Sequence, residues 1–539
     1  MKIILSSVVL SGVLLANQNI TLQWLQDKPK SIAKDFYIYR YLNQDINSSQ
    51  ALKALQQIKY LNNSMFHRFA KKYNEKIYKY QSKCLKMSYY KLPYETPFCI
   101  ETGLSVYDAT RLSSNLLEKT RKKIKNKYPI LEKKLKIIDS SIPFDNLILS
   151  DNKIFFGVFN QCGGKYRVKY FNRSFPSELL SRLKTNKQFY QMIKLIVTNP
   201  KMTNAQKSLF GFYNKNLDFR TTFMLAINSI KYNKIDQALL YLSEAYKKAY
   251  FQMQKDNIVF WQYLLTKDKR YLELLLKSWD INIYTIYAYQ TVSKKFDNII
   301  YDIKVDKEKN KLYDPLIPFK WLSVLKDTKK MSLKKIEKYN KLFDAKDTLG
   351  HLAFVKERFY KYKKSYFITP YKESIKNLPI KRQILLYALA RQESRFIPTS
   401  ISSSYALGIM QIMPFLSKAL SKQLKEPYNI DNQFIPEISL KYASKHLDFL
   451  EKRLPNPLFI AYAYNGGIGF TKRILKNGLF KEKGKYEPFL SMELLPYDET
   501  KKYGKKVLAN YIIYYNYLIK AKKLRIIDFF NSIIKSNHK

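Results

Sequence analysis

Apolar residues recur at helical spacing along most of this chain. From about Asn17 to Leu349 they alternate with basic positions, with few helix breakers and no strong strand signature. Only 14 of the 539 residues are glycine and 19 are proline, which argues against sandwiches, barrels and collagen-like repeats. The sequence therefore predicts an all-α protein.

Between residues 238 and 275 the helical pattern breaks into short amphipathic segments joined by polar turns. Their apolar positions are Ala238, Leu239, Leu240, Leu242, Ala245, Tyr246, Phe260, Trp261, Leu264, Leu265, Tyr271, Leu272 and Leu275. Such segments are typical of stacked helix pairs, so we expect an α-superhelical, solenoid-like region, although no period is clean enough to count repeats. An exception is Lys153 to Tyr170, where an aromatic run before Gly163 and Gly164 favours a small hairpin.

The pattern of the sequence changes near Ser365 to Pro370. From there, shorter helices are separated by prolines at positions 370, 379, 398, 414, 427, 436, 455, 457, 488 and 496. We therefore expect a helical superhelix domain over residues 17–349, a linker region over 350–365, and a compact domain over 366–539.

The N-terminus has the pattern of a secretory signal peptide. Lys2 precedes an apolar stretch from Ile3 to Leu15, which ends at Ala16 and turns polar at Asn17. This stretch is shorter than the about 20 residues that a transmembrane helix needs. We expect residues 1–16 to be a signal peptide and the protein to be exported. An uncleaved anchor and a buried N-terminal element are the alternatives.

The chain is strongly basic and poor in cysteine. Its 96 Lys and Arg residues against 43 Asp and Glu residues give a formal charge of +53. Nucleic acid, an anionic lipid surface or an acidic polymer would suit this charge, and a mutational bias toward AT-rich codons is the alternative explanation. Export disfavours nucleic acid and favours an anionic envelope polymer. The three cysteines cannot form a disulfide framework, although Cys84 and Cys99 can form one bridge in an oxidising compartment.

One apolar helix ends in a carboxylate. Within residues 384–398, Glu393 shares a helical face with Leu386 and Leu389, so its carboxyl is directed toward the core. Burial and the negative end of the helix dipole both raise the pKa of a carboxyl. A carboxyl that keeps its proton near neutral pH is what a general acid requires. The alternative is a structural acid paired with an arginine.

Three further motifs follow this helix in order. They are residues 402–414 (SSSYALGIMQIMP), residues 461–467 (AYAYNGG), and residues 496–503 (PYDETKKY) with 507–511 (VLANY). With Gln392-Glu393-Ser394, they resemble the catalytic domain of the soluble lytic transglycosylases of bacterial cell-wall metabolism, which is similar to goose-type lysozyme. The resemblance implies a lysozyme-like α-helical catalytic domain at 366–539, and by analogy a ring-like superhelix before it.

The resemblance also implies roles for residues of the first two motifs. Glu393 matches the family's single catalytic acid, and Ser402 matches a serine near the N-acetyl group of the substrate. Gln411 and Met413 match residues that line the sugar groove. Taken alone, Ser402 is one of several loop serines and Met413 is a core filler.

The last two motifs supply the remaining site residues. Tyr464 matches a tyrosine that hydrogen-bonds the acid or the transition-state sugar, and Asn465 lies beside it, where a helix cap is the alternative. Glu499 matches an acid that contacts the amino sugar or the peptide stem. Among the predicted site residues, Glu393 and Tyr464 together are the strongest candidates.

The chain departs from the family pattern at three positions. A glycine common in the loop before residues 408–414 (GIMQIMP) is Tyr405 here, an arginine in the last motif is Lys501, and an asparagine of the family is Ser439. These differences concern the groove and not the reaction.

The resemblance implies cleavage of the bond between N-acetylmuramic acid and N-acetylglucosamine without water. The products are 1,6-anhydromuramoyl ends, formed in cell-wall turnover with help from the substrate's acetamido group. A muramidase would need a second acid, for which Asp431, Glu437 and Glu499 are candidates. A non-catalytic wall-binding scaffold is another alternative, and a nucleic-acid binder is the weakest because no recognition motif occurs.

The same resemblance sets the expected partners and location. Peptidoglycan glycan strands and their peptide stems are the expected partners, and cell-wall synthesis or remodelling proteins are candidates. We expect a periplasmic protein with no integral membrane segment after signal cleavage, no nucleic-acid partner, no metal and no organic cofactor. The four histidines are scattered and form no metal-binding motif.

Overall fold

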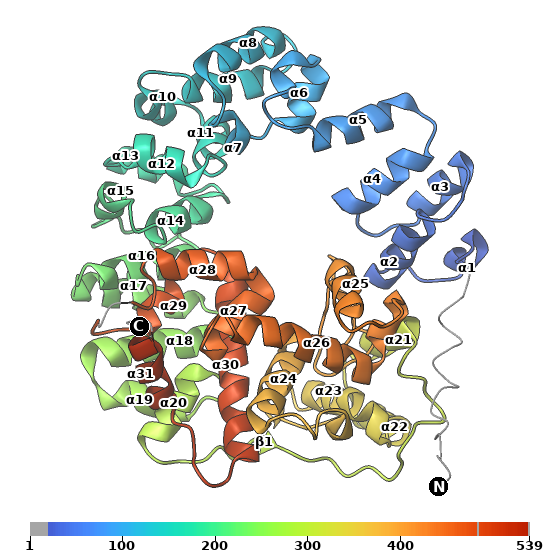
Figure 1. The fold of residues 1–539 in the computed structure, drawn as a ribbon. Coiled ribbons are helices and arrows are strands. Elements are labelled where there is room, and N and C mark those ends of the chain that lie inside the picture. The colour runs from blue at the N-terminus through green and yellow to red at the C-terminus, as the bar shows by residue number, and fades with distance from the viewer. Residues whose placement is uncertain (1–19, 482–483, 537–539) are drawn as a thin grey trace. The chain divides into compact units, whose positions relative to one another are not determined.

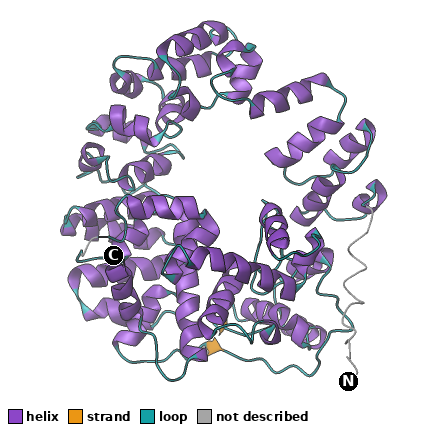
Figure 2. Cartoon of the chain, viewed as in Figure 1, coloured by secondary structure: helices purple, strands orange, loops and turns teal. Residues whose placement is uncertain are grey.

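The computed structural model describes residues 20–481 and 484–536. Helices form nearly all of the regular structure in these ranges, as Figure 2 shows, so the expected all-α class is confirmed. Two short strands, β1 (Ile299–Ile300) and β2 (Ser365–Tyr366), pair in parallel with Ile299 opposite Ser365. The predicted signal peptide, residues 1–16, lies outside the described residues.

The chain divides into two compact units. The first contains the described part of residues 1–72 together with 276–475 and 499–539, and the second contains 73–275 and 476–498. Residues 20–72 therefore group with the C-terminal region. The domain boundaries expected near residues 349 and 366 remain a prediction.

The second unit consists of helices that stack in sequence order (Figure 1). They are α5 (Lys76–Lys86), η2 (Leu92–Tyr94), α6 (Pro97–Gly103), α7 (Val106–Ala109), α8 (Ser114–Ile124), α9 (Pro129–Ile138), α10 (Pro143–Leu149), α11 (Asn152–Phe159), α12 (Gly164–Phe171), α13 (Ser177–Leu183), α14 (Phe189–Val197), α15 (Thr203–Lys207), α16 (Phe219–Lys231), α17 (Ile235–Lys248), α18 (Gln252–Thr266), α19 (Lys269–Leu276) and α29 (Phe489–Glu493). Near neighbours pack together, including α8 with α9, α16 with α17 and α17 with α18. Contacts between near neighbours in sequence are the defining property of a solenoid.

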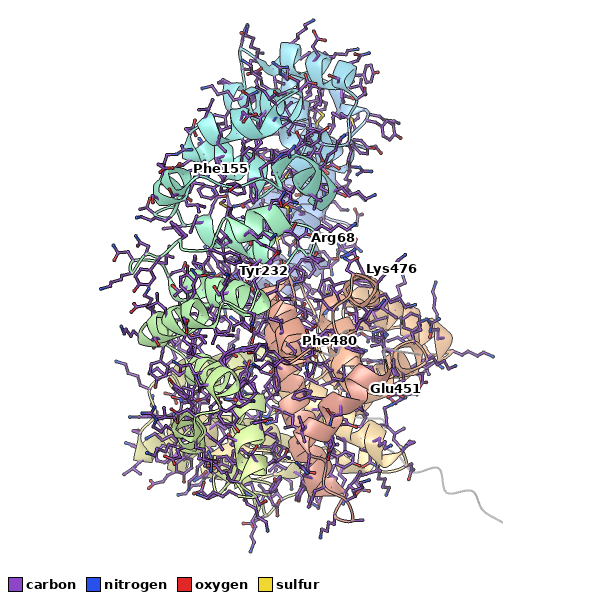
Figure 3. All side chains as sticks on the ribbon, turned by 90° about the vertical axis from the view of Figure 1, so that its left-hand side faces the viewer. Arg68, Phe155, Tyr232, Glu451, Lys476 and Phe480 are labelled. Carbon is purple, nitrogen blue, oxygen red and sulfur yellow. A yellow bond between two sulfur atoms is a disulfide. The ribbon has the colours of Figure 1, made fainter. Side chains whose placement is uncertain are left out.

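The hairpin predicted for residues 153–170 is wrong, because this segment forms α11 and α12. The Asp151 carboxylate accepts a hydrogen bond from the Ile154 amide at 2.9 Å and caps the start of α11. Phe155, labelled in Figure 3, is fully buried, and its ring stacks on Phe159 at 5.8 Å. The aromatic run therefore serves the core between helices, and burial overrides its strand propensity.

A disulfide joins α5 to α6 within the second unit. It connects Cys84 and Cys99, which are 15 residues apart in sequence. Closing a loop of this length stabilises a fold by about 3 kcal/mol in the chain-entropy model. The sequence allowed this bridge without deciding whether it forms, and the structure contains it.

Residues 476–498 belong to the second unit although they lie late in the chain. α29 packs against α16, and Phe489 contacts Phe260 with ring centroids 4.5 Å apart. Asp498 accepts hydrogen bonds from the Tyr190 hydroxyl at 2.8 Å and the Lys194 ammonium at 2.9 Å. The stretch just before the last long helix is thus fixed on the stacked helices.

The first unit is also helical. Its helices are α1 (Leu22–Gln26), α2 (Ile32–Tyr41), α3 (Ser48–Leu55), α4 (Asn63–Lys72), α20 (Ile283–Thr291), α21 (Pro318–Asp327), α22 (Leu333–Leu342), η3 (Lys346–Thr348), α23 (Leu349–Phe359), η4 (Lys372–Ser374), α24 (Ile380–Glu393), α25 (Pro414–Gln423), η5 (Ile430–Phe434), α26 (Pro436–Glu451), α27 (Pro457–Gly466), α28 (Ile468–Lys476), α30 (Asp498–Leu518) and α31 (Ile526–Ser536). α26 packs against α24, α25 and α27. α23 occupies much of the predicted linker region.

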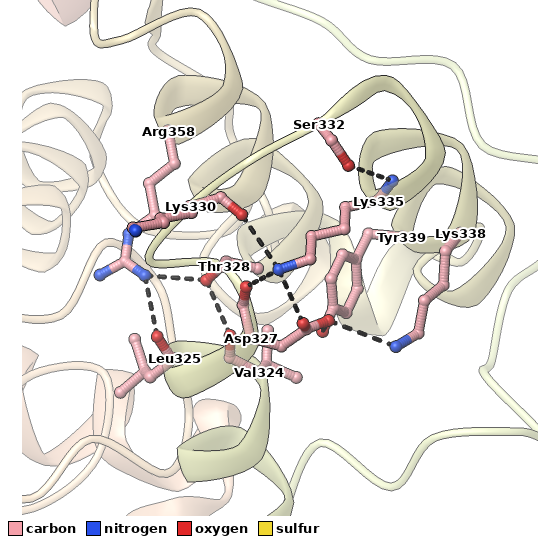
Figure 4. Close-up of polar contacts among 10 residues, drawn as sticks. All are labelled: Val324, Leu325, Asp327, Thr328, Lys330, Ser332, Lys335, Lys338, Tyr339 and Arg358. Atoms are coloured by element: carbon pink, nitrogen blue, oxygen red, sulfur yellow. Dashed lines mark hydrogen bonds and ion pairs between the residues drawn. The ribbon is translucent and has the colours of Figure 1, made fainter.

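A polar cluster ties α21, α22 and α23 together (Figure 4). The Asp327 carboxylate accepts hydrogen bonds from the Tyr339 hydroxyl at 2.8 Å and the Lys338 ammonium at 3.3 Å, and it pairs with Lys335 at 2.9 Å. These bonds, with that from Lys335 first, lower the pKa of Asp327 to about 2. From α23, Arg358 donates to the Leu325 carbonyl at 3.1 Å, so the three helices form one packed corner.

Candidate active site

α24 is a buried helix that ends at the predicted acid. Pro379 precedes its first residue, and all residues from Ile384 to Ala390 are buried, as expected for a helical stretch that is apolar on every side. Glu393 is the last helical residue and remains partly exposed. The next residue, Ser394, donates its hydroxyl to the Ile409 carbonyl at 2.8 Å, which fixes the helix end against the following loop.

Two arginines flank Glu393 in sequence, and both pair with another acid. Arg391 donates to the Glu357 carboxylate at 3.2 Å and to the Asn510 side chain at 3.0 Å. Arg395 forms an ion pair with the same Glu357, whose side chain is 5% exposed. Among the described residues, no arginine forms an ion pair with Glu393, which disfavours the alternative of an arginine-paired structural acid.

The hydrogen-bond partner of Glu393 is a tyrosine. The Tyr503 hydroxyl on α30 donates to the Glu393 Oε1 atom at 2.6 Å. Loss of hydration raises the pKa of Glu393 from 4.5 to about 7; the Tyr503 bond opposes this shift and the charge of Glu499 adds to it. Glu393 therefore holds and releases a proton near neutral pH, as a group that acts both as an acid and as a base must do.

Tyr464 lies in the same site but its hydroxyl has a different partner. It donates to the Met410 carbonyl at 2.8 Å, which ties α27 to the loop after α24. Burial and the charge of Glu393 raise the pKa of Tyr464, so it stays a neutral donor. The bond to the acid that the resemblance allowed for Tyr464 is made instead by Tyr503.

No role was predicted for Tyr503, although it ends the last motif. Its separation from Glu393 is 110 residues, so no local pattern reveals the contact. The sequence signal that could have pointed to Tyr503 is its spacing from Glu499, because residues four apart lie on one face of a helix.

Asn465 and Glu499 join the ends of α27 and α30. The Asn465 amide donates to Glu499 Oε1 at 3.4 Å, and the Thr500 hydroxyl donates to the Asn465 amide oxygen at 2.7 Å. A β-carbon on Gly466 would lie 3.0 Å from the Thr500 hydroxyl, so only glycine allows this close approach without movement.

The loop after α24 carries the other predicted residues. Ser402 and Ala406 exchange two hydrogen bonds: the Ser402 amide donates to the Ala406 carbonyl at 3.0 Å, and the Ala406 amide donates to Ser402 Oγ at 2.9 Å. The Gln411 amide donates to the carbonyls of Ser400 at 2.9 Å and Gly408 at 2.8 Å. The Gln411 side chain therefore holds the loop, and its NH2 group is already used.

The structure brings four of the predicted residues together: Glu393 and Glu499 interact electrostatically, as do Glu393 and Tyr464, and Asn465 contacts Glu499. Ser402, Gln411 and half-buried Met413 lie on the neighbouring loop. Within the described ranges, no hydrogen bond links those three side chains to Glu393.

In residues 20–481 and 484–536, no three His, Cys, Asp or Glu side chains are grouped so as to hold a metal ion. Across the same part of the chain, no helix combines the length and apolarity needed to cross a bilayer.

Comparison with known families identifies the C-terminal region. Residues 376–487 match the family model described as transglycosylase SLT domain. The matched segment contains Glu393, the loop after α24 and Tyr464. The resemblance predicted from the order of the motifs is thereby confirmed.

Curated relatives match over the same part of the chain. The soluble lytic murein transglycosylase of Escherichia coli is 33% identical over 138 residues, which are 25% of this chain and 21% of that protein. The soluble lytic murein transglycosylase of Salmonella typhimurium is 32% identical over 144 residues, which are 26% of this chain and 22% of that protein. The alignments thus span about a fifth of these relatives.

Solved structures match over most of the chain at low similarity. The 70 kDa soluble lytic transglycosylase of Escherichia coli has a TM-score of 0.48 and 16% identity, covering 92% of this chain and 83% of that one. The lytic transglycosylase Slt of Pseudomonas aeruginosa has a TM-score of 0.48 and 13% identity, covering 94% and 90%.

Proposed function

We propose that this protein is a peptidoglycan lytic transglycosylase that cleaves the bond between N-acetylmuramic acid and N-acetylglucosamine in cell-wall turnover. The observation that carries the proposal is Glu393, a carboxyl at the end of α24 that accepts a hydrogen bond from Tyr503 and whose pKa burial raises to about 7. The transglycosylase SLT domain match over residues 376–487 supports it.

The proposed reaction uses Glu393 twice. Its proton passes to the oxygen between the two sugars as the bond from this oxygen to C1 of the muramoyl residue breaks. The acetamido oxygen of the same residue stabilises C1. Ionised Glu393 then takes the proton of the muramoyl C6 hydroxyl, whose oxygen bonds to C1 and displaces the acetamido oxygen. Glu393 is again protonated, and no water is consumed.

Tyr503 and Tyr464 support this proton cycle. The Tyr503 hydroxyl donates to the carboxylate that forms when Glu393 loses its proton. Tyr464 keeps the Met410 carbonyl and its loop in place through the 2.8 Å bond. A single acid whose charged form is stabilised by one hydrogen bond suits transfer of a proton in both directions.

A muramidase needs a second carboxylate to activate water. Among the three candidates, Asp431 is held by Arg40 through bonds of 2.7 and 3.0 Å, which favours a structural role. Glu437 lies in the first turn of α26, and its charge helps to raise the pKa of Tyr371. Glu499 is the candidate whose charge acts on Glu393, so hydrolysis would depend on Glu499.

The proposed location is the periplasm, reached through the signal peptide at residues 1–16. The Cys84–Cys99 disulfide supports an oxidising compartment. The proposed partners are glycan strands and peptide stems, together with cell-wall synthesis or remodelling proteins, because a charge of +53 suits an anionic polymer.

Digestion of insoluble peptidoglycan tests the proposal. The purified full-length protein is expected to release soluble muropeptides in proportion to its concentration. Binding without release would support the non-catalytic scaffold and overturn the proposed activity.

Tyr503→Phe should lower kcat by about 10- to 100-fold, because the ionised form of Glu393 loses a charge-assisted hydrogen bond. The Tyr503 bond lowers the pKa of Glu393, so its removal should move the basic limb of the pH profile to higher pH. Tyr515→Phe, on the same helix, should change neither quantity. A basic limb that stays in place or moves down in Tyr503→Phe would refute this role.

The wild-type pH profile should report the raised pKa of Glu393. The free enzyme needs protonated Glu393, so kcat/KM should be level below pH 7 and fall above it by about 10-fold per pH unit. The measurement is kcat/KM for muropeptide release from pH 4 to 9 in buffers of constant ionic strength. A decline that begins near the ordinary value of 4.5 would contradict the role of Glu393 as the acid.

A further inference from the structure

Tyr405 occupies a backbone conformation that usually belongs to glycine. Its φ is 66°, in the left-handed region, which costs a non-glycine residue about 1–2 kcal/mol. The residue is nevertheless buried, with 4% of its surface exposed. A strained residue persists only where its surroundings compensate for the strain, so the contacts of the Tyr405 ring must offset this cost.

Those contacts come from the N-terminal helices of the same unit. The Tyr405 ring lies 5.0 Å from the ring of Tyr39 and 5.9 Å from that of Phe36, both from α2. Arg68 of α4, labelled in Figure 3, packs on the Tyr39 ring: its guanidinium carbon lies 3.5 Å from the ring centroid. Arg68 also donates to the Tyr39 carbonyl at 2.8 Å, so two helices hold the stack.

α2 is itself fixed to the C-terminal part of the unit. Arg40 forms a two-bond pair with Asp431 of η5, and this geometry is specific as well as strong. Phe36 also meets Phe434 of η5 edge-on at 6.4 Å. Residues 20–72 therefore supply one wall for the loop that follows α24.

Tyr405 closes the turn that presents Ser402. The Tyr405 amide donates to the Ser402 carbonyl at 2.9 Å, and the next amide, of Ala406, donates to Ser402 Oγ at 2.9 Å. Because this hydroxyl oxygen accepts a hydrogen bond, its own proton can be donated to a substrate carbonyl. The Ser402 hydroxyl is thus oriented by the amide of Ala406, the residue next to Tyr405, which the aromatic stack holds.

We propose that Tyr405 is a positioning residue, which uses α2 and α4 of the N-terminal segment to hold the Ser402 hydroxyl in place for the N-acetyl group of the glycan. The inference rests on the proposed function. Residues 20–72 would then support the substrate site through their contacts with Tyr405.

Three substitutions at Tyr405 separate the ring from the strain. Tyr405→Gly removes both, Tyr405→Ala removes the ring and keeps the strained φ, and Tyr405→Phe keeps both. We expect kcat/KM to fall about 10-fold in the glycine and alanine variants and to stay near wild type in the phenylalanine variant. The alanine variant should have the lower Tm of the first two, although both lose activity equally.

Coupling to Ser402 distinguishes positioning from stability. Ser402→Ala should lower kcat/KM in the wild-type background and have little further effect in Tyr405→Gly, because Ser402 is already misplaced there. Tyr39→Ala should show the same coupling. Effects of Ser402→Ala and Tyr405→Gly that simply add would overturn the proposal.

Amide hydrogen exchange gives a readout that needs no turnover. Exchange in residues 402–407 should be faster in Tyr405→Gly and Tyr39→Ala and unchanged in Tyr405→Phe. If the wild-type protein releases nothing from peptidoglycan, the proposed function fails, and exchange still decides the positioning role. Unchanged exchange in Tyr405→Gly would overturn that role.

Discussion

Glu393→Gln is expected to abolish muropeptide release, with a loss of at least about 10³-fold in kcat. The amide has nearly the shape of the acid, but it can neither protonate the glycosidic oxygen nor accept the C6 hydroxyl proton. Binding to insoluble peptidoglycan should persist, and it is measured by sedimentation beside the release assay. Release at more than a few per cent of the wild-type rate would exclude Glu393 as the single acid.

The same variant should be more stable than wild type at alkaline pH. The pKa of Glu393 is about 7 in the folded protein, against the ordinary value of 4.5 that applies to the unfolded chain. The folded protein therefore loses stability as the pH rises from 4.5 to 7. Glutamine removes this loss, which amounts to as much as about 3 kcal/mol above pH 7. Urea unfolding at pH 5 and pH 8 measures the difference.

Glu337→Gln is the matched control, because Glu337 is exposed on α22. It should change neither release nor the pH dependence of unfolding. A Glu393→Gln protein that is less stable than wild type at pH 8 would contradict the desolvated setting of the acid.

Gly408→Ala should disrupt the loop that carries Ser402 and Gln411. A β-carbon on Gly408 would lie 1.9 Å from the Gln433 carbonyl oxygen, and the φ of 77° adds strain for any other residue. Because the obstacle is backbone, the loop must move, and we expect a loss of about 3 kcal/mol or more in unfolding free energy. Muropeptide release should fall at least about 100-fold in the fraction that remains folded.

Gly469→Ala is the control for Gly408→Ala. A β-carbon on Gly469 meets no atom within 4 Å, and the residue lies in helix α28. Alanine there should leave release unchanged and stabilise the protein slightly, by up to about 1 kcal/mol. Equal effects of the two substitutions, measured by urea unfolding and release, would contradict the steric account of Gly408.

Much of the fold could be predicted because it follows local patterns. The apolar run before Glu393 predicts a buried helix, and α24 ends at that residue. The segment 153–170 was mispredicted because its aromatic residues have strand propensity, whereas a capping aspartate and burial make it helical. Tertiary packing decides such segments, and a sequence pattern does not contain it.

The candidate site was predictable only in part. Motif order identified the family whose model residues 376–487 match. It also predicted that Glu393, Tyr464 and Glu499 share one site. The Tyr503 bond and the pairing of Arg40 with Asp431 could not be predicted, because they join residues 110 and 391 positions apart. The domain boundaries stay predictions, as do the roles of all seven predicted site residues, Glu393, Ser402, Gln411, Met413, Tyr464, Asn465 and Glu499.

The most direct test is digestion of peptidoglycan in water enriched in oxygen-18, followed by mass spectrometry of the released muropeptides. A single-acid transglycosylase should give anhydromuramoyl ends that are one water lighter than muramidase products and carry no heavy oxygen at the cleaved bond. Reducing muramoyl ends that contain oxygen-18 would show that water attacks C1 and would contradict the proposed reaction.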